Sequence, residues 1–302
     1  MNEKRLLTPK RWGNLAPYLL MLPTIALLCW LLIYPVGNVF YTSLRQEMLS
    51  RPKQNAFIGL ANYMKIAGDK VFWEALGNSL RWVITEVGLQ LVGGLGLALI
   101  LKKKFRGCGA FRAILFLPWA LSGVLVSMLW SMMYYENVGV LNDLLQNLGI
   151  IHKAIAWTGN KNTAFWALVI AELWRGIPFF SIMLLASLQS VPDELYEACR
   201  VDGGSPFQGF FYITLPYVKE TLVLTTLLRT IWEFNSVDLI LNLTGGGPVH
   251  KTTTLAVYLA NTARKDGNFG YGSALAVISF LILLVFAASY LKMSGFGKEE
   301  EM

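Results

Sequence analysis

The feature that most constrains this chain is a set of long apolar segments. A helix rises 1.5 Å per residue, so about 20 apolar residues cross the ~30 Å hydrocarbon core of a bilayer. Barrel strands are excluded because the runs lack alternation, and an isolated span must satisfy its own backbone hydrogen bonds. The sequence therefore predicts an all-α polytopic membrane protein with six transmembrane helices, near residues 15–36, 77–101, 111–133, 164–188, 217–241 and 271–291.

Composition supports a membrane protein. Of the 302 residues, 55% are hydrophobic and 15% are charged, against about 45–50% and ~25% in soluble domains. The net charge of +7 gathers in short runs beside apolar segments, which indicates membrane topology rather than a nucleic-acid partner. The first apolar run has 22 residues and no small-residue cleavage site, so we expect a retained span rather than a signal peptide. Cys29, Cys108 and Cys199 follow no disulfide or metal-binding pattern.

Lysine and arginine counts predict the orientation. Four lie in residues 1–14, and five crowd the short connection between the second and third spans. Because cytoplasmic loops are rich in these residues, both segments are expected inside the cell. We therefore expect a cytoplasmic N-terminal segment at 1–14, a six-helix permease domain at 15–291 and a cytoplasmic tail at 292–302. The connections 37–76, 134–163 and 242–270 are then external, although the first also carries five basic residues. Residues 138–150 predict a short external helix.

The loop between spans four and five, residues 190–216, is polar and lies on the cytoplasmic side in this topology. Within it, Pro192 and Asp193 favour a helix start, and Gly203 with Gly204 favour its end. Ser205 followed by Pro206 is typical of a second helix start. The segment 193–216 is therefore predicted to be a helical hairpin, which could transmit motion from a soluble partner to the spans.

Catalytic motifs are absent from the sequence. It contains no GxxxxGK[ST], HExxH or GxSxG pattern, and its two histidines lie in predicted external loops. We therefore expect a subunit that is not an enzyme. If ATP drives it, another chain binds that ATP.

The hairpin resembles the EAA motif of ABC importer permeases, in which a coupling helix docks on a cytoplasmic ATPase. The resemblance assigns an ATPase-coupling role to eight residues: Glu197, Ala198, Cys199, Asp202, Gly203, Ile213, Leu215 and Pro216. Cys199 stands where the motif usually has alanine.

The segments 57–80, 112–121 and 243–248 also resemble carbohydrate-type permeases similar to the maltose permease subunit. The resemblance implies a bacterial inner-membrane location, a second permease subunit that in this family is usually a different chain, two ATPase subunits that use ATP and Mg²⁺, and an external solute-binding protein. It implies no cofactor on this chain. The large external domain and extra spans of the maltose subunit are missing, so a glycerol-phosphate-type permease stays open as an alternative.

Six ionisable residues fall inside the predicted spans, where charge is costly unless it is paired. Glu172 with Arg175 and Arg229 with Glu233 have the spacing of intrahelical ion pairs; whether they are structural pairs or pathway residues stays open. A helical face in the fifth span carries Trp232, Asn235, Asp238 and Asn242, whose amides, carboxylate and ring suit sugar hydroxyls and C–H faces. These four are the candidate substrate-pathway residues, with interhelical hydrogen bonding as the alternative.

Two other classes of membrane protein fit the sequence less well. An ion-coupled secondary transporter or channel could use Glu86, Glu172 and Asp238 as a relay, but internal repeats are not visible in the sequence. A purely structural scaffold would have no use for the motif at 197–216.

Overall fold

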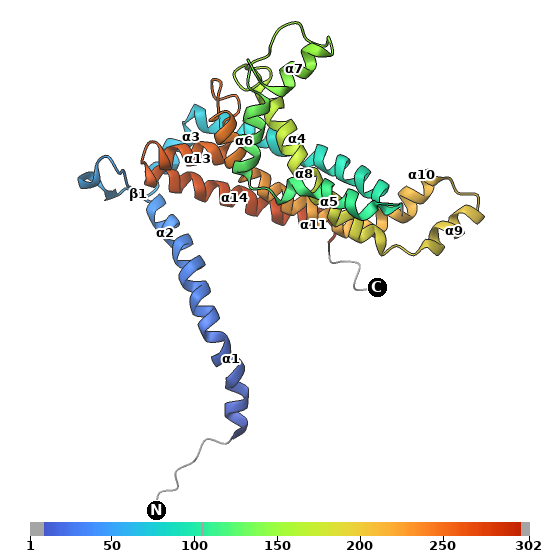
Figure 1. The fold of residues 1–302 in the computed structure, drawn as a ribbon. Helices are drawn as coiled ribbons and strands as arrows, with labels where there is room; N and C mark the ends of the chain where they lie inside the picture. Colours follow the sequence, from blue (N-terminus) through green and yellow to red (C-terminus); the bar gives the residue numbers. More distant parts are fainter. Residues whose placement is uncertain (1–8, 104–105, 297–302) are drawn as a thin grey trace, which may run out of the picture. The chain divides into compact units, whose positions relative to one another are not determined.

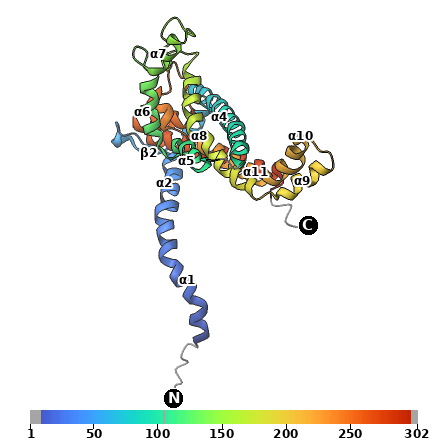
Figure 2. The same ribbon diagram turned by 45° about the vertical axis from the view of Figure 1, so that its right-hand side comes forward.

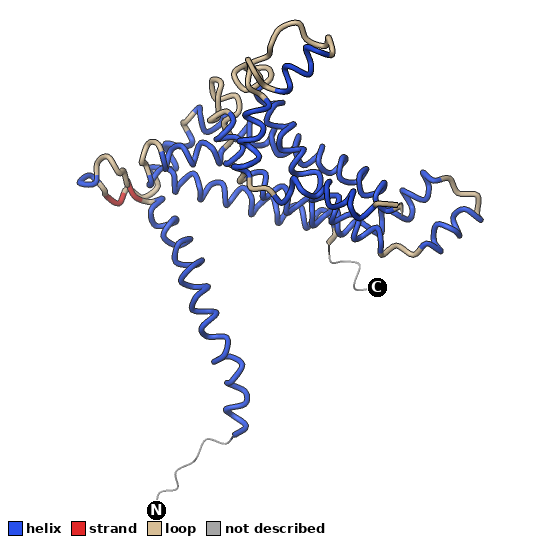
Figure 3. The backbone as a smooth tube through the Cα atoms, in the orientation of Figure 1, coloured by secondary structure: helices blue, strands red, loops and turns tan. Residues whose placement is uncertain are grey.

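The computed structural model describes residues 9–103 and 106–296, with side chains from Pro17 onward. Figure 3 shows that this part of the chain is mostly helical, as predicted, with loops and one pair of short strands. Its contacts divide it into two compact units, Met1–Lys65 with Thr262–Val277, and Ile66–Asn261 with Ile278–Met302. Helices α13 (Leu255–Arg264) and α14 (Phe269–Ser294) each contribute to both units, as does α3 (Ala61–Ala67).

The first unit begins with a helical rod formed by α1 (Pro9–Leu28), the π-helical turn η1 (Cys29–Ile33) and α2 (Tyr34–Ser43). The rod leads into a hairpin of two short strands, β1 (Arg45–Gln46) and β2 (Ala56–Phe57), joined through the 3₁₀ turn η2 (Pro52–Gln54). The side-chain amide of Asn62 donates to the carbonyls of Ser43 and Arg45, at 2.9 Å each. These bonds fasten the strand pair to the end of the rod.

The second unit is built around α4 (Lys70–Lys102), α8 (Ala164–Gln189) and α11 (Leu215–Phe234), which pack against one another (Figure 1 and Figure 2). Gly94 of α4 faces Phe180 of α8 so closely that a Cβ at Gly94 would overlap the Cβ of Phe180. Small residues let membrane helices approach closely, and Phe180 and Ala98 are both fully buried. Glycine at this position therefore allows α4 and α8 to pack closely.

Two helices of this unit are broken rather than continuous. The segment predicted as one span at 111–133 consists of α5 (Cys108–Ala120) and α6 (Gly123–Met133), which meet at an angle of 97°. The continuous helix predicted over 217–241 is wrong, because α11 ends at Phe234 and α12 (Asp238–Leu243) starts after a break of three residues. The helix α12 packs against α6, so the two breaks face the same region.

By length and composition, four described helical segments could cross a membrane: Pro17–Ser43, Lys70–Lys102, Ala164–Gln189 and Phe269–Ser294. The bent α5–α6 pair would make five. The helix α11 carries four charged residues, Lys219, Glu220, Arg229 and Glu233, and does not reach the same criterion. The short helix predicted near 138–150 is present as α7 (Val140–Asn147). The predicted cytoplasmic ends lie largely outside the described residues.

Candidate functional site

The polar loop after α8 folds into a helical hairpin, as the sequence predicts. Its first arm, α9, spans Asp193–Val201 and is capped by Asp202. The Gly204 N–H then donates to the Cys199 carbonyl at 2.7 Å while Gly203 adopts φ +77°, the combination of a Schellman cap. Glycine reaches this left-handed region at little cost, whereas a side chain is strained there. Gly203 is therefore the turning point of the hairpin.

The second arm starts at Ser205 with a capping box. The Gln208 N–H donates to the Ser205 hydroxyl, and the Ser205 N–H donates to the Gln208 side chain at 2.7 Å. The arm continues through α10 (Pro206–Gly209) and the π-helical turn η3 (Phe210–Thr214) directly into α11. Pro216 follows η3 by two residues, as Pro35 follows η1. A widened turn suits a proline because its ring crowds the carbonyl four residues earlier.

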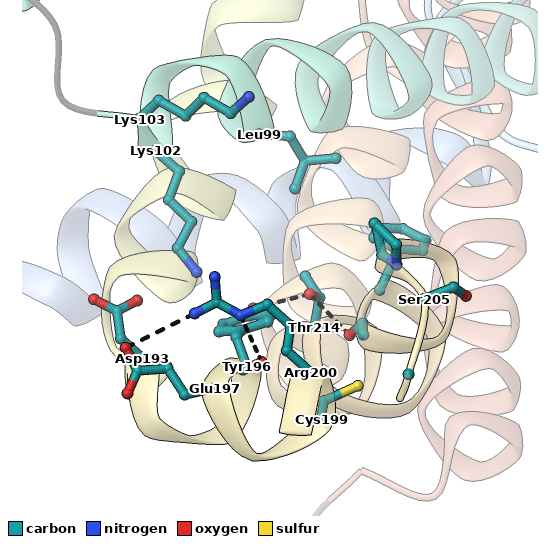
Figure 4. Close-up of a pocket in the computed structure, with 14 residues that line it drawn as sticks. Leu99, Lys102, Lys103, Asp193, Tyr196, Glu197, Cys199, Arg200, Ser205 and Thr214 are labelled. Carbon is teal, nitrogen blue, oxygen red and sulfur yellow. Dashed lines mark hydrogen bonds and ion pairs between the residues drawn. The ribbon is translucent and has the colours of Figure 1, made fainter. Parts of the chain in front are cut away.

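Side-chain contacts hold the hairpin in place against the membrane helices. The hydroxyls of Tyr196 and Thr214 lie 2.9 Å apart and join the two arms. The Lys102 ammonium, at the end of α4, lies 4.1 Å from the centre of the Tyr196 ring. Figure 4 shows these groups around a cavity of about 830 Å³ between the hairpin and the end of α4. A hairpin anchored in this way can move as one body with α4 and α11.

The eight motif residues lie together on this hairpin and at the start of α11. Glu197, Ala198, Asp202, Gly203 and Pro216 are exposed, while Cys199, Ile213 and Leu215 are partly buried. Sequence reasoning missed the anchoring residues Tyr196, Thr214 and Lys102. It also missed three strongly exposed apolar side chains: Val201 (86%), Phe207 (75%) and Tyr212 (79%). Their apolar character in a polar loop was the available signal.

Both predicted ion pairs form, but as parts of one network rather than as separate pairs. Arg175 binds Glu172 through two bonds, of 3.1 and 2.7 Å. Arg229 contacts Glu233 at 2.7 Å on its own helix and also reaches Glu172 of α8 at 2.8 Å. Glu172 therefore binds both guanidinium groups.

The network extends to α4, which the sequence analysis did not foresee. The Arg229 Nε donates to the Gln90 side chain at 2.6 Å, and the Trp82 indole donates to Glu233 at 2.9 Å. Gln90 also donates to Glu86 at 2.9 Å. These α4 residues and Glu233 are buried, and burial of charge is tolerated where it is paired and hydrogen-bonded. The network thus ties together α4, α8 and α11.

A polar pocket of about 380 Å³ lies beside the network, where the two broken helices meet. Gly123 at the start of α6 lines it, as do Arg175, Arg229, Glu233 and the break that follows α11. Irregular backbone at membrane depth is tolerated where it lines a cavity or is buried in protein. Two helix breaks around one polar pocket therefore indicate a site for a polar solute.

Three of the four predicted pathway residues, Trp232, Asn235 and Asp238, line this pocket, whereas Asn242 does not. The predicted common helical face is wrong because the helix stops at Phe234, which places these residues on the end of α11, the break and the start of α12. Glu233, which pairs with Arg229, also lines the pocket. Arg175, Arg229 and Glu233 are thus both ion-paired and pocket-lining.

The fold and these two features define a class of protein, that of helical membrane proteins with a polar pocket between broken helices and a protruding helical hairpin. Comparison with known proteins gives the family. Residues 90–292 match the family described as binding-protein-dependent transport system inner membrane component, and this chain belongs to it.

Individual relatives agree with this assignment. The chain is 36% identical to the trehalose/maltose transport system permease protein MalF of Thermococcus litoralis, over 93% of this chain and 94% of that protein. It is also 36% identical to the sulfoquinovosyl glycerol transport system permease protein SmoG of Agrobacterium fabrum, over 97% and 96%. A subunit of a bacterial ABC transporter that imports alginate has the same fold, with a TM-score of 0.81 at 21% identity, over 94% of this chain and 98% of that one.

Proposed function

We propose that this chain forms half of the transmembrane pathway of an ATP-driven importer for an oligosaccharide or related carbohydrate. The names of the two relatives described above refer to trehalose and maltose and to sulfoquinovosyl glycerol, which are all sugars or sugar derivatives. The pocket between the broken helices supplies Asn235, Asp238 and the half-exposed ring of Trp232. Its volume is at the small end of the ~300–1,000 Å³ typical of small-molecule sites, which suits a short stretch of sugar.

We further propose that the hairpin at 193–216 couples this pathway to separate ATPase subunits. The observation that carries this proposal is a set of three apolar side chains on this hairpin, Val201, Phe207 and Tyr212, each of which is at least 75% exposed. Exposed apolar groups rimmed by polar residues mark interaction surfaces. The anchoring of Tyr196 by Thr214 and Lys102 would carry force from that surface into α4 and α11.

The remaining parts of the proposal follow from the family. The chain would work in the bacterial inner membrane with six spans and both ends in the cytoplasm. Its partners would be a second permease subunit, two ATPase subunits that bind ATP and Mg²⁺, and an external solute-binding protein. A structure of the alginate transporter that shares this fold includes a periplasmic protein loaded with a pentasaccharide.

The coupling surface is tested by placing a charge on it. We expect Val201→Asp to weaken ATPase binding at least tenfold, because a carboxylate would have to be desolvated in the contact. The control is Val138→Asp, at a valine of similar exposure (81%) that follows α6 and lies far from the hairpin in sequence. The measurement is the amount of ATPase that co-purifies with each variant from membranes containing equal amounts of the permease. Equal recovery with both variants would contradict the proposed surface.

A further inference from the structure

The two relatives with equal identity to this chain differ in an important chemical property. Trehalose and maltose are uncharged, whereas sulfoquinovosyl glycerol carries a sulfonate. Sequence similarity alone does not distinguish an uncharged substrate from an anionic one, but the charges around the pocket do. We infer that the pocket accepts uncharged, hydroxyl-rich carbohydrates and excludes those that carry a carboxylate, sulfonate or phosphate. This inference rests on the proposed function, and it speaks against a glycerol-phosphate substrate.

The two arginines that line the pocket, Arg175 and Arg229, already bind carboxylates. Arg229 is almost fully buried and binds Glu172, Glu233 and Gln90. Arg175 directs its Nε and one terminal nitrogen at Glu172. An anionic ligand is best held by a guanidinium that can offer both of its parallel N–H groups. Arg229 cannot do this without giving up a partner in the network. The remaining terminal nitrogen of Arg175, Nη1, lies 3.9 Å from the Cβ position of Gly123, the same position that the Asp238 carboxylate approaches to 3.5 Å.

Carboxylates outnumber guanidinium groups at this site. Glu172, Glu233 and Asp238 face Arg175 and Arg229, which leaves a formal excess of one negative charge. Asp238 also lies against the start of α6, with its Oδ2 3.5 Å from the position of a Cβ on Gly123. The partial positive charge of that helix end therefore already faces an acid. An anion entering the pocket would meet uncompensated negative charge in a region of low dielectric.

The groups that remain available are mainly hydrogen-bond acceptors. Among the described residues, Asp238 makes no hydrogen bond or ion pair through its carboxylate. The Asn235 amide donates to the Ile231 carbonyl at 2.9 Å, which leaves its oxygen free to accept. The Trp232 ring is 46% exposed and packs against Phe179 at a centroid distance of 5.1 Å. Sugar hydroxyls can donate to both oxygens while a C–H face covers the ring.

The test measures ligand binding to the purified assembly of this chain with its partner permease and ATPases, by ligand-observed NMR titration. The uncharged probes are trehalose, maltose and diacetylchitobiose. The anionic probes are sulfoquinovosyl glycerol, an alginate trisaccharide and glycerol 3-phosphate. We expect the best uncharged probe to bind at least tenfold more tightly than any anionic one. The substitution Asp238→Asn should reduce that preference at least threefold, whereas Asp143→Asn, the same change at an exposed residue of α7, should leave it unchanged.

The outcomes separate the two proposals. An anionic probe that binds as tightly as the uncharged ones overturns the charge inference and leaves the carbohydrate pathway intact. An unchanged preference in Asp238→Asn shows that the pocket carboxylates do not select against charge, which also overturns it. If no probe of either kind gives binding that Asp238→Leu removes, the pocket is not a carbohydrate site, and the proposed pathway fails together with the inference.

Discussion

At the scale of single residues, Glu172 holds the membrane core together. Its two oxygens accept from Arg175 and Arg229, which come from α8 and α11. Arg229 in turn binds Gln90 of α4, so one buried carboxylate stabilises the junction of three helices. Arg175 has a more peripheral position, with a partly exposed side chain. Breaking a buried ion pair by removing one partner typically costs about 3–5 kcal/mol, because the other charge is left buried without compensation.

The substitution Glu172→Gln should therefore destabilise the assembly by about 3–5 kcal/mol, and Arg175→Gln should cost clearly less because Glu172 keeps Arg229. The measurement is thermal unfolding of the purified assembly in detergent. Adding Arg175→Gln to Glu172→Gln removes one unpaired guanidinium and should restore part of the loss. The proposed network is contradicted if Arg175→Gln lowers the thermal stability as much as Glu172→Gln does. It is also contradicted if the double variant is no more stable than the less stable single variant.

At the scale of elements, the close approach of α4 and α8 depends on one glycine. Valine at Gly94 would place a branched side chain against Phe180, and overpacking of this kind costs about 1–3 kcal/mol or more. Gly96 on the same helix has no heavy atom within 4 Å of its Cβ position. We therefore expect Gly94→Val to lower the thermal stability of the assembly and Gly96→Val to leave it nearly unchanged. Equal stability of the two variants would show that α4 and α8 do not pack in this way.

The sequence predicts those elements whose starts and ends are specified by a few neighbouring residues. The hairpin followed from Gly203 and from Ser205 with Pro206, because a left-handed cap and a helix start are each specified by a few neighbouring residues. The break between α5 and α6 was missed although Ser122 and Gly123 form a turn signal. The break after Phe234 contains neither glycine nor proline, and its only turn-forming residues, Asn235 and Ser236, are a weak signal between two apolar stretches.

The charge network was predicted only in part for a similar reason. The pairs within one helix could be read from their three- and four-residue spacings. The bond from Arg229 to Glu172 joins residues 57 positions apart, and the bond to Gln90 joins residues 139 apart. Such contacts depend on how α4, α8 and α11 pack, which helical periodicity alone does not specify.

At the scale of the whole molecule, one helix joins the two features of the site. Helix α11 continues from the hairpin through η3 and ends at the pocket. Leu215 and Glu233 are separated by 18 residue steps, or about 27 Å at 1.5 Å per residue. A movement of the hairpin would therefore reach Trp232 and Glu233 through a continuous helix. This link gives the coupling proposal a physical path between the site of ATP hydrolysis and the solute.

The most direct test of the account compares Gly203→Val with Gly203→Asn in proteoliposomes that contain the complete importer and its loaded binding protein. At φ +77° asparagine is tolerated, whereas a β-branched residue is strongly strained. Both variants should insert in normal amounts. Gly203→Val should lose about tenfold or more of ATP-driven uptake and of substrate-stimulated ATP hydrolysis, while Gly203→Asn retains most of both. Full uptake and full ATPase association in Gly203→Val would contradict the account, because the hairpin would then be only a connection between two helices.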